Sequence, residues 1–141
     1  MARRIKARAF EHNQLGVTFF QSGAVDLAVE QFRLATRRAS WVPSYWLNLG
    51  VALLEKGELD EAERALRRNL ALNPESQSAY FHLGQLYHRR NDESASRRAY
   101  RKSVELAPYT YLAQRARERV EGWRPRLIIE SGGKKAGDSE G

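Results

Sequence analysis

Hydrophobic residues recur with helical spacing along most of this chain, in segments separated by short polar turns. Trp46, Leu49 and Leu53 share one face of a predicted helix. The next segment repeats this spacing from Leu59 to Leu66, after a Lys-Gly-Glu turn that ends one helix and begins another. The pattern therefore predicts helices that pair as antiparallel hairpins.

The same pattern extends over three hairpins and one further helix. The predicted helices cover residues 9–22 and 24–38, 43–56 and 59–72, 77–90 and 93–106, and 109–122. Gly23, Gly57 and Asn91 occupy the three hairpin turns, where a left-handed backbone is needed. Residues 1–8 either extend the first helix backward or fray, and residues 123–141 form a Gly-rich, charged tail that we expect to be flexible.

A Leu-Gly dipeptide recurs every 34 residues, with its glycine at positions 16, 50 and 84. Aligning the windows 9–42, 43–76 and 77–110 on this glycine brings further positions into register. They are His12, Trp46 and Tyr80; Phe19, Leu53 and Tyr87; Ala28, Ala62 and Ser96; Phe32, Leu66 and Tyr100; and the closing Pro74 and Pro108. A fixed period of this length indicates a solenoid of stacked repeats.

These motifs resemble the tetratricopeptide repeat family, whose repeat is 34 residues long. The resemblance covers residues 9 to about 110, although Ser40 stands where the later copies have Pro74 and Pro108. It implies an all-α fold: a right-handed superhelix of three antiparallel helix hairpins with a capping helix at 109–122. It also implies a concave groove, formed by the first helix of each hairpin, that holds a peptide.

The repeat pattern also predicts the core. The glycine of each Leu-Gly pair should let the partner helix approach closely, with the small residue Ala28, Ala62 or Ser96 opposite it. The predicted core residues are Phe10, Leu15, Phe19, Leu27, Phe32 and Ala35 in the first hairpin, and Trp46, Leu49, Leu53, Leu59, Leu66 and Leu70 in the second. Tyr109, Leu112, Ala116 and Val120 form the buried stripe of the capping helix.

The family resemblance places twelve side chains on the concave wall. They are Asn13, Val17, Phe20, Leu47, Asn48, Val51, Leu54, Phe81, His82, Gln85, His88 and Arg89. The set suits a segment with hydrophobic anchors and a main chain held by amides such as Asn48. Alternatively, Leu47, Val51 and Leu54 pack against neighbouring hairpins, and the groove is narrower and more polar.

One subclass of the family has a more specific ligand. Members that bind the acidic carboxyl terminus of heat-shock chaperones carry a clamp of two lysines, two asparagines and one arginine. The matching positions here hold Asn13, Val17, Asn48, Ser78 and His82, so only Asn48 fits. A terminal carboxylate would meet too little positive charge, and we do not predict that ligand.

The formal net charge of +7 over 141 residues is concentrated at the two ends. Residues 9–108 are nearly neutral, whereas Arg3, Arg4, Lys6 and Arg8 precede them with no acid. Two alternatives to peptide binding follow. In the first, the terminal arginines bind a polyanionic partner, although nucleic acid is not favoured. In the second alternative, the protein forms homo-oligomers through the apolar run 127–129 or through an incompletely capped first hairpin.

No catalytic or metal-binding motif stands out in the sequence. There is no cysteine, and His12, His82 and His88 include no i, i+4 pair. No nucleophile with a base and an orienting group can be assigned. We therefore expect a non-enzymatic protein without a cofactor. The chain shows neither a signal-peptide core nor a membrane-length apolar run, which favours a cytoplasmic location.

Overall fold

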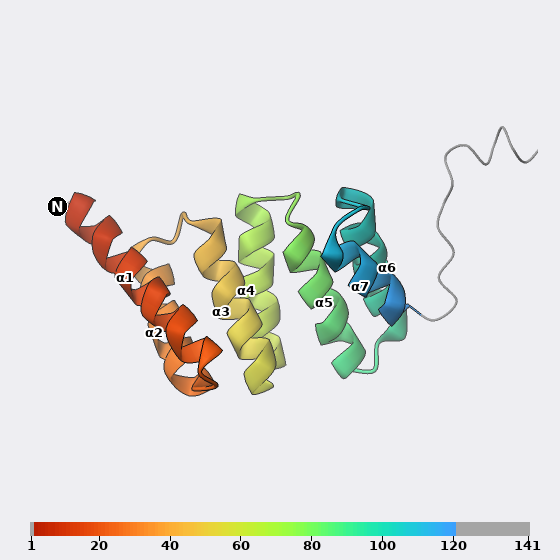
Figure 1. The fold of residues 1–141 in the computed structure, drawn as a ribbon, viewed down its shortest axis with the longest axis horizontal. Coiled ribbons are helices and arrows are strands. Elements are labelled where there is room, and N and C mark those ends of the chain that lie inside the picture. The colour runs from red at the N-terminus through yellow and green to blue at the C-terminus, as the bar shows by residue number, and fades with distance from the viewer. Residues whose placement is uncertain (1, 121–141) are drawn as a thin grey trace, which may run out of the picture.

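A computed structural model of the protein describes residues 2–120, and all regular secondary structure in that range is α-helical (Figure 1). The helices are α1 (Ala2–Gln21), α2 (Val25–Arg38), α3 (Pro43–Lys56), α4 (Leu59–Leu72), α5 (Gln77–Arg89), α6 (Glu93–Leu106) and α7 (Tyr111–Arg119). The predicted bounds of α3, α4 and α6 are confirmed. The helix α1 starts at Ala2, so the basic N-terminal segment extends the first helix.

The helices form three antiparallel hairpins that stack side by side, followed by α7 (Figure 1). The first helices of successive hairpins contact each other, α1 with α3 and α3 with α5, and α5 contacts α7. Among the seven described helices, no such contact joins α2 to α4 or α4 to α6. Because the first helices lie closer together than the second helices, the row bends toward the side of α1, α3 and α5.

Three residues with a left-handed backbone close the hairpins, as predicted. Their φ angles are 87° at Gly23, 93° at Gly57 and 63° at Asn91. At the central turn, the N–H of Gly57 donates to the carbonyl oxygens of Leu53 and Leu54, each at 3.0 Å. Glycine meets this requirement without the steric penalty that Asn91 carries.

The glycine of each Leu-Gly pair brings the two helices of its hairpin together. A Cβ atom added at Gly50 would lie 2.8 Å from Cδ2 of Leu66, and one at Gly84 would lie 2.7 Å from the ring of Tyr100. The predicted close approach is confirmed, but the prediction that a small residue stands opposite was incomplete. A large side chain of the second helix fills the notch, which is the space that a side chain at the glycine would occupy. In the third hairpin, Ser96 also donates to the carbonyl of Gly84 at 2.8 Å.

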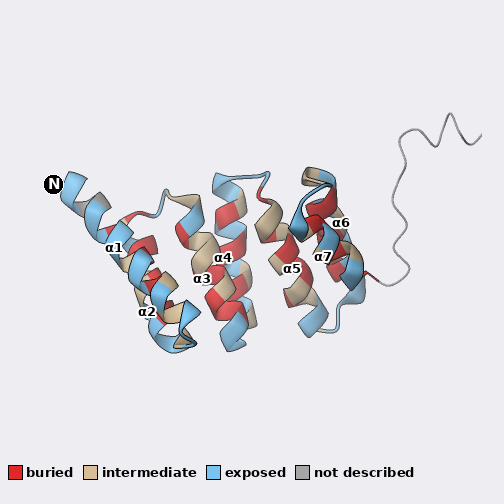
Figure 2. Ribbon diagram, viewed as in Figure 1, coloured by how far each residue is buried: buried red, intermediate tan, exposed pale blue. Residues whose placement is uncertain are grey.

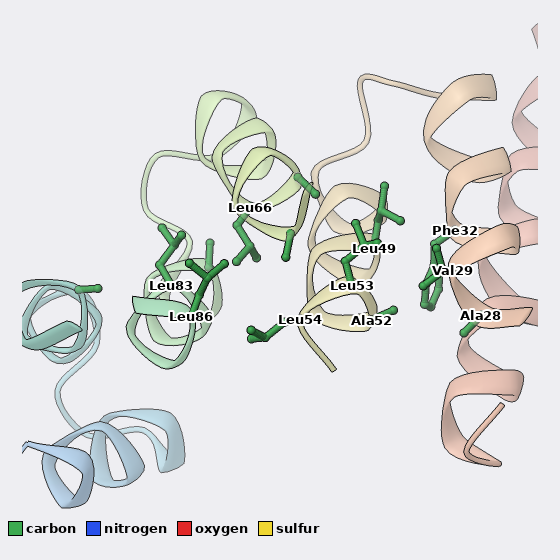
Figure 3. Packing of buried hydrophobic residues seen from close by; sticks show 14 residues of the cluster. Ala28, Val29, Phe32, Leu49, Ala52, Leu53, Leu54, Leu66, Leu83 and Leu86 are labelled. Atoms are coloured by element: carbon green, nitrogen blue, oxygen red, sulfur yellow. The ribbon is translucent and has the colours of Figure 1, made fainter. Parts of the chain in front are cut away.

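The main hydrophobic core runs through all three hairpins (Figure 3). Its labelled side chains come from α2 (Ala28, Val29, Phe32), α3 (Leu49, Ala52, Leu53, Leu54), α4 (Leu66) and α5 (Leu83, Leu86). Buried residues lie on the helix faces that meet neighbouring helices (Figure 2). The predicted core residues Phe19, Trp46, Leu59 and Leu70 are partly buried and pack against this cluster. Ala35 is fully buried in a smaller one.

Three predicted core residues of the first hairpin are exposed. Phe10 is 55% exposed, Leu15 46% and Leu27 47%, so their assignment to the core was wrong. The repeat explains the error at Leu15, because the equivalent Leu49 is buried beside the preceding hairpin. No described helix precedes the first hairpin, so nothing within residues 2–120 covers this face as α2 covers Leu49.

The helix α7 covers the open side of the third hairpin. Ala113, Ala116 and Val120 are buried in a cluster with Phe81 and Tyr100. Leu112 packs against this cluster, as predicted. Tyr109 is 99% exposed, because it lies in the turn before α7 rather than on its buried face. The predicted helix end at 121–122 and the tail 123–141 lie outside the described residues.

Candidate functional site

A pocket of about 310 Å³ opens on the concave side, between α3, α5 and α7. Eight side chains line it: Val51, Leu54, Glu55, His82, Gln85, His88, Arg89 and Arg119. Six of these belong to the predicted concave wall, and they come from two different repeats. The structure therefore gathers half of the predicted set around a single hollow.

His82 is held in this pocket as a neutral side chain. Its Nδ1–H donates to the carbonyl oxygen of Ser78, 2.7 Å away, on the same helix. Burial lowers the pKa of His82 below its ordinary value, and the bond to Ser78 opposes that shift only in part. Because Nδ1 carries the proton, Nε2 is left as a hydrogen-bond acceptor.

The two basic residues that follow His82 on α5, His88 and Arg89, already have partners within the protein. Arg89 donates to the carbonyl oxygen of Leu54, near the C-terminus of α3. A cation there complements the partial negative charge of the helix end. Nδ1 of His88 lies 2.7 Å from Oε1 of Glu93. His88 and Arg89 therefore each have an internal partner, and Arg89 keeps its charge and its remaining N–H donors.

Two asparagines connect the first helices of the first and second hairpins. Nδ2 of Asn48 on α3 donates to Oδ1 of Asn13 on α1 at 2.8 Å. Asn13 is 8% exposed, whereas Asn48 is half-buried and keeps its carbonyl oxygen and one N–H for another partner. The inner faces of α1 and α3 are thus continuous, although neither residue lines the pocket.

The remaining predicted wall residues contribute mainly to packing. Val17, Phe20 and Leu47 are partly buried and pack against the main core. Phe81 is 4% exposed, and its ring meets that of Tyr100 at a centroid distance of 5.5 Å. Phe81 therefore has little surface to offer a ligand. The alternative that Leu47 and Leu54 pack against neighbours matches their position in the core, although Leu54 also borders the pocket.

Sequence reasoning missed two residues of the pocket, Glu55 and Arg119. Glu55 follows Val51 by four residues, so it shares the same helix face and the spacing contained this signal. Arg119 comes from α7 and lies outside the predicted buried stripe of that helix. Its place in the pocket depends on how α7 packs across α5 and α6, and no sequence pattern specifies that angle.

The described residues offer no alternative site for metal chemistry. Within residues 2–120, no group of three or more histidine and acidic side chains is arranged to hold a metal ion. None of the helices in that range combines the length and apolar character needed to cross a bilayer.

The architecture defines the class of the protein. It is a stack of helix hairpins with a repeat of 34 residues, and each hairpin has a glycine where its two helices approach closely. The family profile described as tetratricopeptide repeat matches residues 13–68 and 47–110, which together cover most of the chain. The chain belongs to the tetratricopeptide repeat family.

Solved structures of this family share the fold. The first TPR of Spaghetti (RPAP3), bound to the HSP90 peptide SRMEEVD, is 19% identical with a TM-score of 0.74, over 81% of this chain and 90% of that one. PcrH, in complex with the chaperone binding region of PopD, is 20% identical with a TM-score of 0.74, over 79% and 86%. The Arabidopsis OM64 TPR domain is 17% identical with a TM-score of 0.77, over 82% and 95%.

At these identities the likeness concerns the fold alone. No curated protein sequence matches the chain.

Proposed function

We propose that this protein is a non-enzymatic interaction module that holds a peptide or protein segment in its concave groove. The observation that carries the proposal is the pocket of about 310 Å³ in which Val51, His82 and Gln85 meet. Relatives of the same fold, the Spaghetti domain and PcrH, have been solved with a bound peptide and a bound protein region. These complexes support a ligand of the same general kind here.

The chemistry of the pocket favours an uncharged segment with an apolar anchor. Val51 and Leu54 supply apolar surface, while the amide of Gln85 can donate to and accept from a peptide backbone. Nε2 of neutral His82 accepts one further N–H. The two arginines of the lining, Arg89 and Arg119, share it with the carboxylate of Glu55, and Arg89 also donates to the carbonyl of Leu54, which leaves little positive charge for a terminal carboxylate. The ligand we propose is therefore an extended segment rather than an acidic chain terminus.

The test is peptide selection followed by measured affinities. Short random peptides are selected on the full chain, and the best binder is labelled for fluorescence anisotropy. Gln85→Ala removes groove hydrogen bonds, and Val51→Lys places a charge in the apolar part of the pocket. We expect the double variant to bind at least about tenfold more weakly, a change of about 1.4 kcal/mol.

Gln114→Ala is the matched control, because Gln114 is exposed on α7 and does not line the pocket. It should bind with unchanged affinity. If the double variant binds as well as the intact chain while both keep their helical content, the selected peptide occupies another surface, and the proposal fails for this groove.

Self-assembly is a second candidate, supported by the open end of the first hairpin. Leu15 and Leu27 are 46% and 47% exposed there. The equivalent residues one repeat later, Leu49 and Glu61, border the space next to the preceding hairpin. A second copy of the chain could cover the open face. Sedimentation equilibrium across a concentration range should then give a mass that rises for the intact chain and stays monomeric for Leu15→Glu with Leu27→Glu.

The other two sequence alternatives have less support. The apolar run 127–129 lies outside the described residues. Arg3, Arg4 and Arg8 are exposed on the first turns of α1, and they remain a proposal for contact with a polyanion.

A further inference from the structure

A second and larger groove, of about 680 Å³, lies between the second helices α2 and α4. It exists because these two helices do not contact each other, so that α3 forms its floor. Trp46 and Leu49 project into it from α3. With about 3.6 residues per helical turn, residues 46 and 49 lie on the face of α3 opposite to residues 51 and 55 of the concave pocket. We call this surface the outer groove.

Positive charge dominates the outer groove. Five arginines line it, Arg33 and Arg37 from α2 and Arg64, Arg67 and Arg68 from α4, against the single carboxylate of Glu61. Both of its walls are therefore cationic, although residues 9–108 as a whole are nearly neutral.

Two of these five charges are neutralised within the protein. Arg33 forms a two-pronged ion pair with Glu61, in which Nη2 lies 2.9 Å from Oε1. Nη2 of Arg67 lies 2.8 Å from Oε2 of Glu63. The described part of the chain provides no such carboxylate partner for Arg37, Arg64 or Arg68. The charge of Arg64 helps to lower the pKa of Glu61, but Arg37, Arg64 and Arg68 border the groove without a direct ion pair among the described residues.

The repeat provides an internal comparison. A corresponding groove of about 300 Å³ lies between α4 and α6, where Tyr80 and Leu83 take the places of Trp46 and Leu49. It is smaller, and its lining contains two arginines, Arg67 and Arg98. Of these, Arg67 is paired with Glu63. A groove between second helices is therefore a general product of the stack. The concentration of unpaired arginines is particular to the first one.

The surroundings of Trp46 indicate whether the groove is better suited to nucleic acid or to carboxylates. The Arg68 guanidinium lies over its ring at 4.9 Å from the centroid, and the indole N–H donates to the carbonyl of Ser40 at 2.8 Å. Single-stranded nucleic acid binds by stacking successive bases on several aromatic side chains, and the lining of this groove holds a single aromatic ring. Carboxylates instead match the planar fork of arginine.

We propose that the outer groove binds a protein segment in which acidic side chains flank an apolar anchor. The anchor packs against the partly buried Trp46 and the aliphatic stems of the lining arginines, and the carboxylates pair with Arg37 on one wall and with Arg64 and Arg68 on the other. This surface faces away from the concave pocket, so the module holds two segments of different chemistry at once.

The test uses a labelled synthetic peptide in which glutamates flank a central Leu-Phe pair, with fluorescence anisotropy on the full chain. The variant carrying Arg37→Gln, Arg64→Gln and Arg68→Gln should bind at least about tenfold more weakly. The matched control carries Arg3→Gln, Arg4→Gln and Arg8→Gln, which removes the same charge from α1. It should stay within about twofold of the intact chain. A glutamine version of the peptide should bind weakly to all three proteins.

Further arms separate the competing explanations. The double variant Arg37→Gln with Arg64→Gln keeps the Arg68–Trp46 contact, so its loss of affinity reports charge alone. Gln85→Ala in the concave pocket should leave this peptide unaffected. Equal weakening by the α1 control would mean diffuse attraction and would overturn the proposal. So would absence of binding at about 100 μM peptide, or tighter, groove-dependent binding of a single-stranded oligouridylate of equal length.

Discussion

Asn48 of α3 donates a side-chain N–H to Oδ1 of Asn13 of α1, 2.8 Å away, and this bond joins the first two hairpins on the inner side of the stack. Asn13 is 8% exposed, so its carbonyl oxygen has little access to water. A buried polar atom that loses its partner carries the full cost of its desolvation.

The first prediction is therefore that Asn48→Ala lowers the free energy of unfolding by about 1–3 kcal/mol. Asn13→Ala should cost less, because it leaves the half-buried Asn48 able to meet water. Urea unfolding of both single variants and of the double variant gives their coupling energy, expected at about 0.5–1.5 kcal/mol. Strict additivity of the two single effects would contradict a direct bond.

The second prediction concerns the notch at Gly50. A Cβ atom there would lie 2.8 Å from Cγ of Leu66 and 3.3 Å from its backbone N, so the two helices must separate to admit it. Gly50→Ala should lower the free energy of unfolding by about 1–3 kcal/mol, despite the higher helix propensity of alanine. Thermal and urea unfolding measure the change. Leu66→Ala, which removes the clashing atoms, should make the added methyl group at position 50 far less harmful.

Gly23→Ala serves as the comparison for this prediction. Gly23 has nothing within 4 Å of an added Cβ, but its φ is 87°. Its cost of about 1–2 kcal/mol should come from backbone strain alone, and Leu66→Ala should not alter it. An unchanged stability of Gly50→Ala would mean that α3 and α4 do not approach as closely as the structure indicates.

The sequence predicted the hairpins well because the period carries redundant information. The ends of α3 and α4 follow from the turn glycine and from the apolar spacing on either side of it, and three copies agree. The errors lie where a repeat lacks its neighbour. Leu15 and Leu49 occupy the same position, yet Leu15 is 46% exposed and Leu49 only 4%. Helical periodicity reports an apolar face, whereas burial depends on the helix that covers it.

The repeat pattern predicted only part of the candidate site. His82, Gln85 and Arg89 follow from the inward face of a helix that the repeat defines. Arg119 depends on the packing of α7, which is not a copy of the repeat. The bond from Arg89 to the carbonyl of Leu54 also had no sequence signal, because the two residues are 35 positions apart.

The third prediction follows from the carboxylate of Glu63, which links the second and third hairpins. Burial by itself raises its pKa, but hydrogen bonds from Arg90, Arg67 and Tyr87 outweigh this and lower the pKa from 4.5 to about 2. A lowered folded-state pKa adds stability above the unfolded value of 4.5. That contribution is lost as the pH falls through the interval from 4.5 to about 2.

Glu63→Gln should therefore be less stable than the intact chain by about 1–3 kcal/mol at neutral pH, and the gap should close as the pH approaches 2. Urea unfolding at a series of pH values measures it. The exposed Glu75→Gln variant provides the control and should follow the intact chain throughout. A gap that stayed constant with pH would assign the effect of Glu63 to packing rather than to its charge.

The fourth prediction concerns α7, which closes the stack. Ala116 is fully buried against the cluster that contains Phe81 and Tyr100. Ala116→Asp would bury an unpaired carboxylate there, so α7 should detach, at a cost of about 3 kcal/mol or more. Stacked repeats open from the uncovered end, because each unit contacts only its neighbours. Amide hydrogen exchange should therefore speed up in α5 and α6 while α1 to α4 keep their protection.

The exposed Glu118→Ala variant should exchange like the intact chain. Equal acceleration in all helices would instead mean that the three hairpins unfold as one unit.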